Sequence, residues 1–231
     1  MDFITRTETK YLVHVENFNA IRDAFSEYLE KDKYYFYKVH NIYFDNADNQ
    51  IISHSIEAPE YKEKLRMRMY EHPGAVFQDA YIELKKKYLG VVYKRRKKLD
   101  LDAARQAIAQ DVGCIDSECQ VMREILFYMK KTACYPKIYL SYERYSYYAT
   151  EDSGLRVTFD TNIVSRRENL KFASSKEDSV PLLKNHMILE IKTCNYYPLW
   201  LIKILNDYKI YPTSFSKYGK IFEAEKVKEA A

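Results

Sequence analysis

Basic side chains occupy alternate positions in one short segment of the sequence, at Lys62, Lys64, Arg66 and Arg68. In a β-strand, residues two apart share a face, so these four side chains point the same way. The planar guanidinium of arginine binds phosphate oxygens in pairs, and the ammonium of lysine supplies a compact positive charge. The segment therefore predicts a strand whose polar face binds phosphate groups.

The same alternation recurs elsewhere in the chain. The other same-face groups are Glu83, Lys85 and Lys87; Lys94 and Arg96; Arg144 with Tyr142 and Ser146; Arg156, Thr158 and Asp160; Glu190 and Lys192; and Arg6, Glu8 and Lys10. Glu8, Glu83 and Glu190 each stand two residues from a base, and Asp160 stands four residues from Arg156. Carboxylates suit Mg²⁺ or Mn²⁺, which keep part of their water and bridge to substrate phosphates. The pattern predicts a site that holds a polyanion and its metal together.

Half-buried strands with a solvated outer face are the simplest alternative explanation of the alternation. Two features argue against it for the set as a whole. First, arginine and lysine recur at adjacent same-face positions, where like charges directly opposite each other across strands repel. Second, the few acids on these faces stand close to a base. Such a face needs an anionic partner. If the basic face points inward, the sheet must close into a barrel around a water-filled tunnel.

The composition fits a soluble globular protein. The 231 residues are 47% hydrophobic and 30% charged, with a mean hydropathy of −0.51 and a net charge of +4. No apolar run is long enough to span a bilayer, and the N-terminus has no signal-peptide pattern, so we expect a cytoplasmic protein without membrane insertion. The four cysteines have no metal-ligand spacing and are expected to be reduced thiols.

Strand patterns dominate the chain. The expected strands cover residues 6–14, 35–45, 61–70, 80–88, 91–98, 137–149, 155–164 and 187–193. The expected helices cover residues 18–30 after an Asn17 cap, 101–112 after Asp100 or Asp102, 117–131, 198–208 with Pro198 in the first turn, and a C-terminal helix capped by Ser216. Residues 46–53 are expected to form a short helix or turn, and residues 166–185 a loop. Gly90 fits a tight hairpin.

These elements predict one α+β domain over residues 1–231. Its expected core element is an antiparallel β-barrel, a tunnel for triphosphate, with helices packed outside. The two helices between residues about 100 and 131 interrupt the strands and are expected to be an insertion.

An ordered set of motifs resembles the VTC-type polyphosphate polymerase domain of the triphosphate tunnel metalloenzyme (CYTH-like) superfamily, in its stand-alone bacterial form. The motifs are Arg6-Thr7-Glu8-Thr9-Lys10-Tyr11, Ile42-Tyr43-Phe44-Asp45-Asn46, Lys64-Leu65-Arg66-Met67-Arg68-Met69-Tyr70, Ile82-Glu83-Leu84-Lys85, Val92-Tyr93-Lys94-Arg95-Arg96, Ser141-Tyr142-Glu143-Arg144, Leu155-Arg156-Val157-Thr158-Phe159-Asp160, Leu189-Glu190-Ile191-Lys192 and Ser214-Phe215-Ser216-Lys217-Tyr218-Gly219. The superfamily's CYTH branch opens with E-x-E-x-K. Arg6 stands in place of the first acid here and favours the polymerase-like branch.

The resemblance implies roles for individual residues. Those expected to act on the phosphate chain as catalytic residues are Lys10, Arg66, Arg68, Lys85, Lys94, Arg144, Arg156 and Lys217. Ser216 is expected to hydrogen-bond phosphate, and Lys64 and Lys192 join the phosphate-binding set through the alternation. Glu190 is expected to bind Mn²⁺ or Mg²⁺, with Glu83 and Glu8 as further metal or metal-supporting candidates.

The expected function is metal-dependent phosphoryl transfer on ATP, triphosphate or polyphosphate, with polyphosphate synthesis from ATP preferred. Hydrolysis of tripolyphosphate or nucleoside triphosphate is the alternative, with Glu8 able to activate water. A non-catalytic polyphosphate-binding module is a second alternative. Single-stranded RNA binding is disfavoured, because tyrosines such as Tyr93, Tyr145 and Tyr147 fall opposite the basic face rather than beside it.

Overall fold

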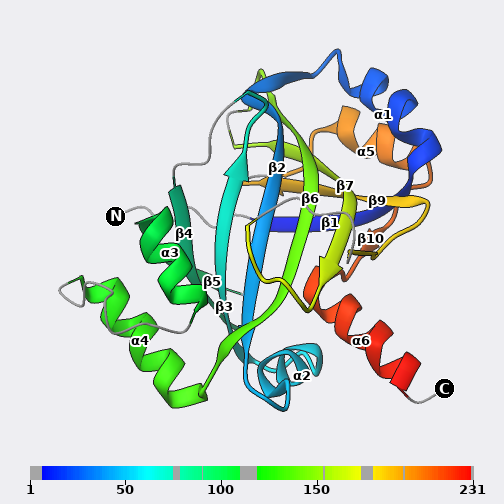
Figure 1. The fold of residues 1–231 in the computed structure, drawn as a ribbon. Helices are drawn as coiled ribbons and strands as arrows, with labels where there is room; N and C mark the ends of the chain where they lie inside the picture. Colours follow the sequence, from blue (N-terminus) through cyan, green and yellow to red (C-terminus); the bar gives the residue numbers. More distant parts are fainter. Residues whose placement is uncertain are drawn as a thin grey trace. The chain divides into compact units, whose positions relative to one another are not determined.

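A computed structural model describes residues 7–74, 79–89, 91–109, 119–152, 154–172, 179–194 and 196–229 (Figure 1). Arg6 and Gly90, named above, lie outside these ranges, as do one of the four cysteines, Cys114, and residues 117–118 at the start of the helix expected over residues 117–131. The three described cysteines, Cys119, Cys134 and Cys194, form no disulfide. Across the described residues, no helix combines the length and apolar character needed to cross a bilayer.

The structure is α+β with an antiparallel sheet. Its strands are β1 (Thr7–His14), β2 (Leu29–Asp45), β3 (Tyr61–Glu71), β4 (Asp79–Tyr88), β5 (Val91–Asp100), β6 (Tyr135–Ala149), β7 (Arg156–Arg166), β8 (Val180–Pro181), β9 (His186–Thr193) and β10 (Pro212–Thr213). Hydrogen bonding orders them β10-β1-β9-β7-β6-β2-β3-β4-β5, with β8 paired to β7. Among the described residues β10 and β5 end this path and do not pair with each other, so the predicted barrel closure is not confirmed.

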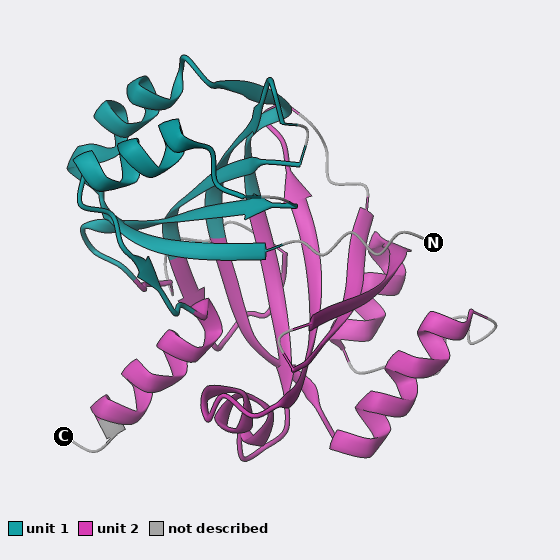
Figure 2. Cartoon of the chain, turned by 180° about the vertical axis from the view of Figure 1, so that it is seen from behind, with its two compact units in different colours: residues 1–38, 142–163, 183–215 teal, residues 39–141, 164–182, 216–231 magenta. Residues whose placement is uncertain are grey.

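The helices lie between groups of these strands along the chain, and α6 follows the last strand. They are the short 3-10 helix η1 (Val15–Asn17), then α1 (Phe18–Phe25), α2 (Gln50–Ile56), α3 (Leu101–Ile108), α4 (Gln120–Thr132), α5 (Leu199–Asp207) and α6 (Lys217–Glu229). The chain divides into two compact units (Figure 2). Unit 1 comprises residues 1–38, 142–163 and 183–215, and unit 2 comprises residues 39–141, 164–182 and 216–231. The expectation of one domain over residues 1–231 stays a prediction.

Each unit has its own hydrophobic core. In unit 1, the strand residues Phe159 and Leu189 are fully buried in one cluster with Ile21 of α1 and Leu201 of α5. In unit 2, Leu65, Met67, Ile82 and Leu84 occupy alternate positions of β3 and β4 and pack against α3 and α4. Since residues two apart share a strand face, the basic residues of β3 and β4 lie on the face opposite this core. The helical pair therefore contributes core side chains, including Ala104, Ala107, Met122 and Ile125.

Most element boundaries agree with the sequence pattern, but three predictions about helix ends are wrong. Helix α1 ends at Phe25 instead of Glu30, because the Ser26 amide and hydroxyl both donate to Asp23 O and terminate it. Asn17 makes no side-chain cap, since the preceding η1 turn gives it a helical backbone. Pro198 precedes α5 and lies outside its first turn.

Strand β2 begins six residues before the expected start, at Leu29 rather than Tyr35. This early part lacks apolar alternation and is joined to its neighbours by polar contacts instead. Tyr148 donates a hydrogen bond to Glu30, and Arg156 pairs with Asp32 at 2.8 Å.

Two predicted helix caps are confirmed. Asp100 accepts from the amide of Ala103 at 2.7 Å, and Ser216 accepts from the amide of Gly219 at 3.2 Å.

Candidate functional site

Three strands of unit 2 align their basic residues in rows. The register of β3, β4 and β5 places Lys85 directly between Lys64 and Lys94. The same register places Glu83 between Arg66 and Arg96. We call this polar surface of β3, β4 and β5 the basic face. Its lysines and arginines are Lys62, Lys64, Arg66, Arg68, Lys85, Lys87, Lys94, Arg96 and Lys98.

Glu83 is the buried centre of the basic face. Its side chain is 1% exposed, and its Oε2 accepts from Nε and Nη2 of Arg66 at 2.8 and 2.7 Å. Lys94 Nζ lies 3.2 Å from Oε1. Burial raises the pKa of Glu83, but the positive charges of Arg66, Arg68 and Lys94 outweigh it and lower the pKa to about 2. Glu83 is therefore an ionised anchor that orients two predicted phosphate ligands.

Tyr43 of β2 lies beside Arg66, and the pKa of its hydroxyl depends on the positive charges there. Its hydroxyl accepts a hydrogen bond from Arg66 Nη1 at 3.3 Å. Burial raises the pKa of Tyr43, yet Arg66, Arg68 and Lys64 together lower it to about 8. A phenol whose pKa is lowered despite burial indicates positive charge in excess of what Glu83 neutralises. The basic face is thus prepared for a further anion.

Two contacts fix other members of the basic face. Arg68 Nε donates to Asn41 Oδ1 at 2.8 Å, and the fully buried Asn41 in turn donates to the carbonyl of Leu140 at 3.2 Å. Lys64 Nζ lies 3.3 Å from Ser216 Oγ, the hydroxyl that caps α6. Within unit 2, Ser216 is therefore brought to the predicted phosphate ligand Lys64. Lys217 is the first residue of α6, and its role stays a prediction.

The Asp45 and Tyr218 motif residues have a structural explanation. Asp45 is fully buried and accepts from the amides of Ile51 and Ile52 at the start of α2, both at 3.0 Å. Tyr218 donates to Asp45 Oδ2 at 2.9 Å. A Cβ at Gly219 would lie only 3.2 Å from Ser216 Cβ, so glycine leaves room for the capping serine. These motifs join α6 to α2 and hold Ser216 in place.

Three strands of unit 1 carry a cluster of mixed charge. The register of β1, β9 and β7 gives one row of Glu8, Lys192 and Arg156 and a second row of Lys10, Glu190 and Thr158. Lys192 Nζ lies 2.5 Å from Glu190 and 3.6 Å from Glu8. Lys10 Nζ lies 3.3 Å from Glu8 and 4.0 Å from Glu190. We call Glu8, Lys10, Glu190 and Lys192 the acid–lysine cluster.

Two further predicted phosphate ligands of unit 1 are held by acids. Arg144 makes a paired contact with the fully buried Asp160, at 2.6 and 2.8 Å. Burial lowers the pKa of Arg144, but Asp160 outweighs it and raises the pKa above the ordinary range. Arg156 is half exposed and pairs with Asp32. A phosphate reaching these arginines would share them with a carboxylate.

The structure therefore brings the predicted residues together in two sets. Unit 2 holds Lys64, Arg66, Arg68, Lys85, Lys94 and Ser216 with Glu83, while unit 1 holds Lys10, Arg144, Arg156 and Lys192 with Glu8 and Glu190. Sequence reasoning missed Tyr43, Asn41, Asp32 and the orienting role of Asp160. Tyr43 lies inside a quoted motif, but its contact with Arg66 depends on which strands are neighbours.

A divalent cation fits the acid–lysine cluster chemically. Glu8 and Glu190 offer hard oxygen ligands on adjacent strands, and Mg²⁺ commonly binds one or two carboxylates together with substrate phosphates. The hydroxyl of Thr158, across from Glu190, is buried and has no hydrogen-bond partner in the part of the chain that the structure describes. Among the described residues no group of three or more His, Cys, Asp and Glu side chains could hold a metal alone. The metal ligands Glu190, Glu83 and Glu8 stay predictions.

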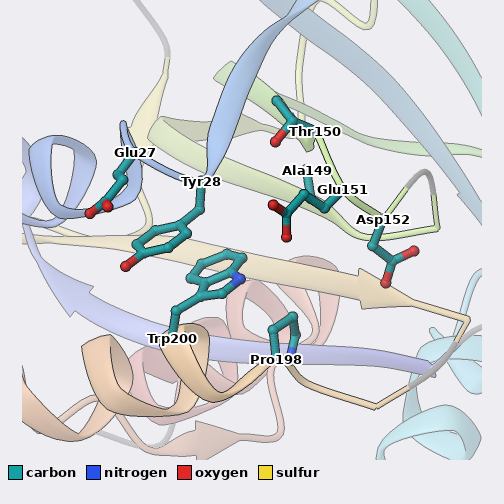
Figure 3. A pocket seen from close by; sticks show the side chains of 8 residues that line it. All are labelled: Glu27, Tyr28, Ala149, Thr150, Glu151, Asp152, Pro198 and Trp200. Carbon is teal, nitrogen blue, oxygen red and sulfur yellow. The ribbon is translucent and has the colours of Figure 1, made fainter.

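A separate hollow of about 250 Å³ lies in unit 1 and is a poor phosphate site. It is lined by Glu27, Tyr28, Ala149, Thr150, Glu151, Asp152, Pro198 and Trp200 (Figure 3). The rings of Tyr28 and Trp200 stack in parallel, with centroids 4.4 Å apart. Three carboxylates give the hollow a negative charge, and none of the predicted site residues lines it.

Two solved structures share this fold at low sequence identity. A proposed adenylate cyclase (bh2851) from Bacillus halodurans has a TM-score of 0.57 and 15% identity, with 92% of this chain and 94% of that chain covered. The PH1819 protein from Pyrococcus horikoshii OT3 has a TM-score of 0.50 and 12% identity, with 95% and 99% covered.

The sequence itself defines the family. The VTC domain matches residues 5–224, nearly the whole chain. The protein therefore belongs to the VTC domain family, as its motifs predicted. No curated protein shows a significant sequence match.

Proposed function

We propose that this protein is an enzyme that transfers a phosphoryl group from a triphosphate-class substrate, with polyphosphate synthesis from ATP as its reaction. The observation that carries the proposal is the basic face of unit 2, where Lys64, Lys85 and Lys94 stand directly opposite one another. Like charges in this arrangement repel. A chain of phosphates would relieve that repulsion and accept hydrogen bonds from all three.

The chemistry requires charge stabilisation rather than a covalent protein intermediate. In phosphoryl transfer the bond between the terminal phosphorus and its bridging oxygen breaks, and a bond to the acceptor oxygen forms. With ATP as donor, ADP leaves and the terminal phosphate of a growing chain attacks. Arg66, oriented by Glu83, would stabilise negative charge on the transferred group. Membership in the VTC domain family supports this reaction class.

The acid–lysine cluster is the proposed metal site. A bound Mn²⁺ or Mg²⁺ would neutralise and orient phosphate oxygens there. Glu190 is the proposed principal ligand. Its side chain is 7% exposed, less than that of Glu8, the other carboxylate of the acid–lysine cluster. Lys192 and Lys10 hold both carboxylates in the structure, and they would move to phosphate oxygens when a cation takes their place. The closed tunnel and the cytoplasmic location stay predictions.

The test is to incubate the purified protein with ATP and Mn²⁺ and to resolve the products on a gel. Polyphosphate with release of ADP is the expected result. Free phosphate without polyphosphate would show a hydrolase, with water as acceptor. If ATP or tripolyphosphate binds but is not consumed with Mn²⁺ or Mg²⁺, the protein is a binding module and the enzyme proposal is wrong.

A further inference from the structure

Thr158 has a buried hydroxyl for which the described residues provide no hydrogen-bond partner. It lies on β7 directly opposite Glu190 of β9, which is itself opposite Lys10 of β1. The residue is 8% exposed, and its Oγ1 atom neither donates nor accepts a hydrogen bond within the described part of the chain. Buried hydroxyls in folded proteins are almost always satisfied, so this one needs an explanation.

The immediate surroundings of Thr158 suit an anionic ligand bound together with a cation. Arg156 stands two residues earlier on the same face of β7, and Lys192 is the neighbour of Arg156 across the strands. Glu190, 7% exposed, is the neighbour of Thr158 itself. A phosphate oxygen placed here would meet two positive side chains and one hydroxyl donor. Glu190 would repel the phosphate unless a lysine or a metal neutralises it.

We propose that the Thr158 hydroxyl donates a hydrogen bond to a phosphate oxygen of the substrate. This inference rests on the proposed function and names a further substrate-binding residue for it. A neutral hydroxyl can approach phosphate next to Glu190 without adding another charge to a cluster that is already balanced. Its donor stays unsatisfied in the protein alone and becomes satisfied when phosphate binds.

The isosteric substitution Thr158→Val should affect the melting temperature and the tripolyphosphate affinity differently. In the protein alone, the melting temperature should be unchanged or higher, because a buried hydroxyl without a partner is removed. Tripolyphosphate in the presence of EDTA should bind roughly 10- to 100-fold more weakly, because a hydrogen bond to a charged oxygen is lost. Thr158→Ser keeps the hydroxyl and should restore most of the affinity.

Calorimetric titration with tripolyphosphate measures these affinities directly. The matched control is Thr161→Val, on the opposite face of the same strand, which should bind like the unmodified protein. A second titration with Mn²⁺ alone should give equal affinities for the unmodified protein and Thr158→Val. If only the Mn²⁺ affinity falls, the hydroxyl supports the metal and the phosphate assignment is wrong.

The remaining outcomes separate this inference from the proposed function. If the unmodified protein binds tripolyphosphate and Thr158→Val binds it equally well, the inference is overturned while the proposed function stands. If Thr158→Val unfolds at a clearly lower temperature, the hydroxyl has a role in the protein alone, and the inference is again wrong. If the unmodified protein binds no tripolyphosphate, with or without Mn²⁺, both fail together.

Discussion

The polar strand faces of the two units differ in charge balance. In unit 2 the basic face carries nine lysines and arginines against three carboxylates, those of Asp79, Glu83 and Asp100. In unit 1 the corresponding face of β1, β9 and β7 carries three bases, Lys10, Lys192 and Arg156, against three acids, Glu8, Glu190 and Asp160. One face has a large surplus of positive charge and the other is neutral.

Phosphoryl transfer requires the binding of a polyanion and the binding of a metal cation, and the two faces differ in which of these they suit. A surplus of fixed positive charge attracts a polyanion and is stabilised by it. A balanced cluster attracts a polyanion less strongly, and its carboxylates suit a divalent cation. We therefore propose anion binding mainly at the basic face of unit 2 and cation binding at the acid–lysine cluster of unit 1.

The largest expected effect is on turnover in Glu190→Gln. The substitution keeps the size of the side chain but removes the charge that would bind Mn²⁺ or Mg²⁺. Metal-dependent consumption of ATP should fall by roughly 100-fold or more. Tripolyphosphate binding in EDTA should be retained or tightened, because a negative charge has left a phosphate site.

The control for this prediction is Glu16→Gln, which removes an exposed carboxylate of unit 1 outside the acid–lysine cluster. It should leave both turnover and binding unchanged. A Glu190→Gln protein that consumes ATP at a near-normal rate with the same metal dependence would remove this residue from the metal site.

The next effect is on the stability of unit 2 in Arg66→Met. Removing this guanidinium leaves the buried carboxylate of Glu83 with Lys94 as its remaining ion-pair partner. Breaking a buried pair from one side costs about 3–5 kcal/mol of unfolding free energy. Urea denaturation should show that loss for Arg66→Met, and the double substitution Arg66→Met/Glu83→Gln should recover most of it. A loss below about 1 kcal/mol would show that Glu83 does not depend on Arg66.

A smaller effect is expected on the titration of Tyr43. Its pKa of about 8 results from the surplus charge of Arg66, Arg68 and Lys64, so a bound triphosphate should raise it toward the ordinary value of 10. By linkage, triphosphate affinity should fall as pH rises above 8 in the unmodified protein and stay flatter in Tyr43→Phe. Ultraviolet difference titration of tyrosinate, with Tyr43→Phe as reference, measures the shift. An unchanged pKa on saturation with tripolyphosphate would place the anion elsewhere.

Much of the fold could be predicted from the sequence because the strands alternate so regularly. Leu65 and Met67 fall on the buried face of β3 and Arg66 on the other, as period-two alternation requires. The early part of β2 was missed, since Asp32 is held there by Arg156, a residue 124 positions away. The end of α1 was missed because the hydroxyl of Ser26 competes for a backbone carbonyl.

The candidate site was predictable in its residue types but not in its pairing. Alternation and motifs identified Arg66, Arg144 and Glu190. They did not show that Glu83 orients Arg66 or that Asp160 occupies Arg144, because cross-strand partners depend on register. The unsatisfied hydroxyl of Thr158 gives no signal in the sequence, since only the three-dimensional contacts show that it has no partner among the described residues.

The most direct test of the central claim is tripolyphosphate binding without metal to a protein whose basic face has lost two of its three aligned lysines. Lys85→Gln/Lys94→Gln removes two of the three aligned lysines, while Lys97→Gln removes a lysine from the opposite face of β5. Calorimetric titration in EDTA should show at least about tenfold weaker binding for the double variant and normal binding for Lys97→Gln. Equal affinity for all three proteins would contradict the assignment of the anion to the basic face of unit 2.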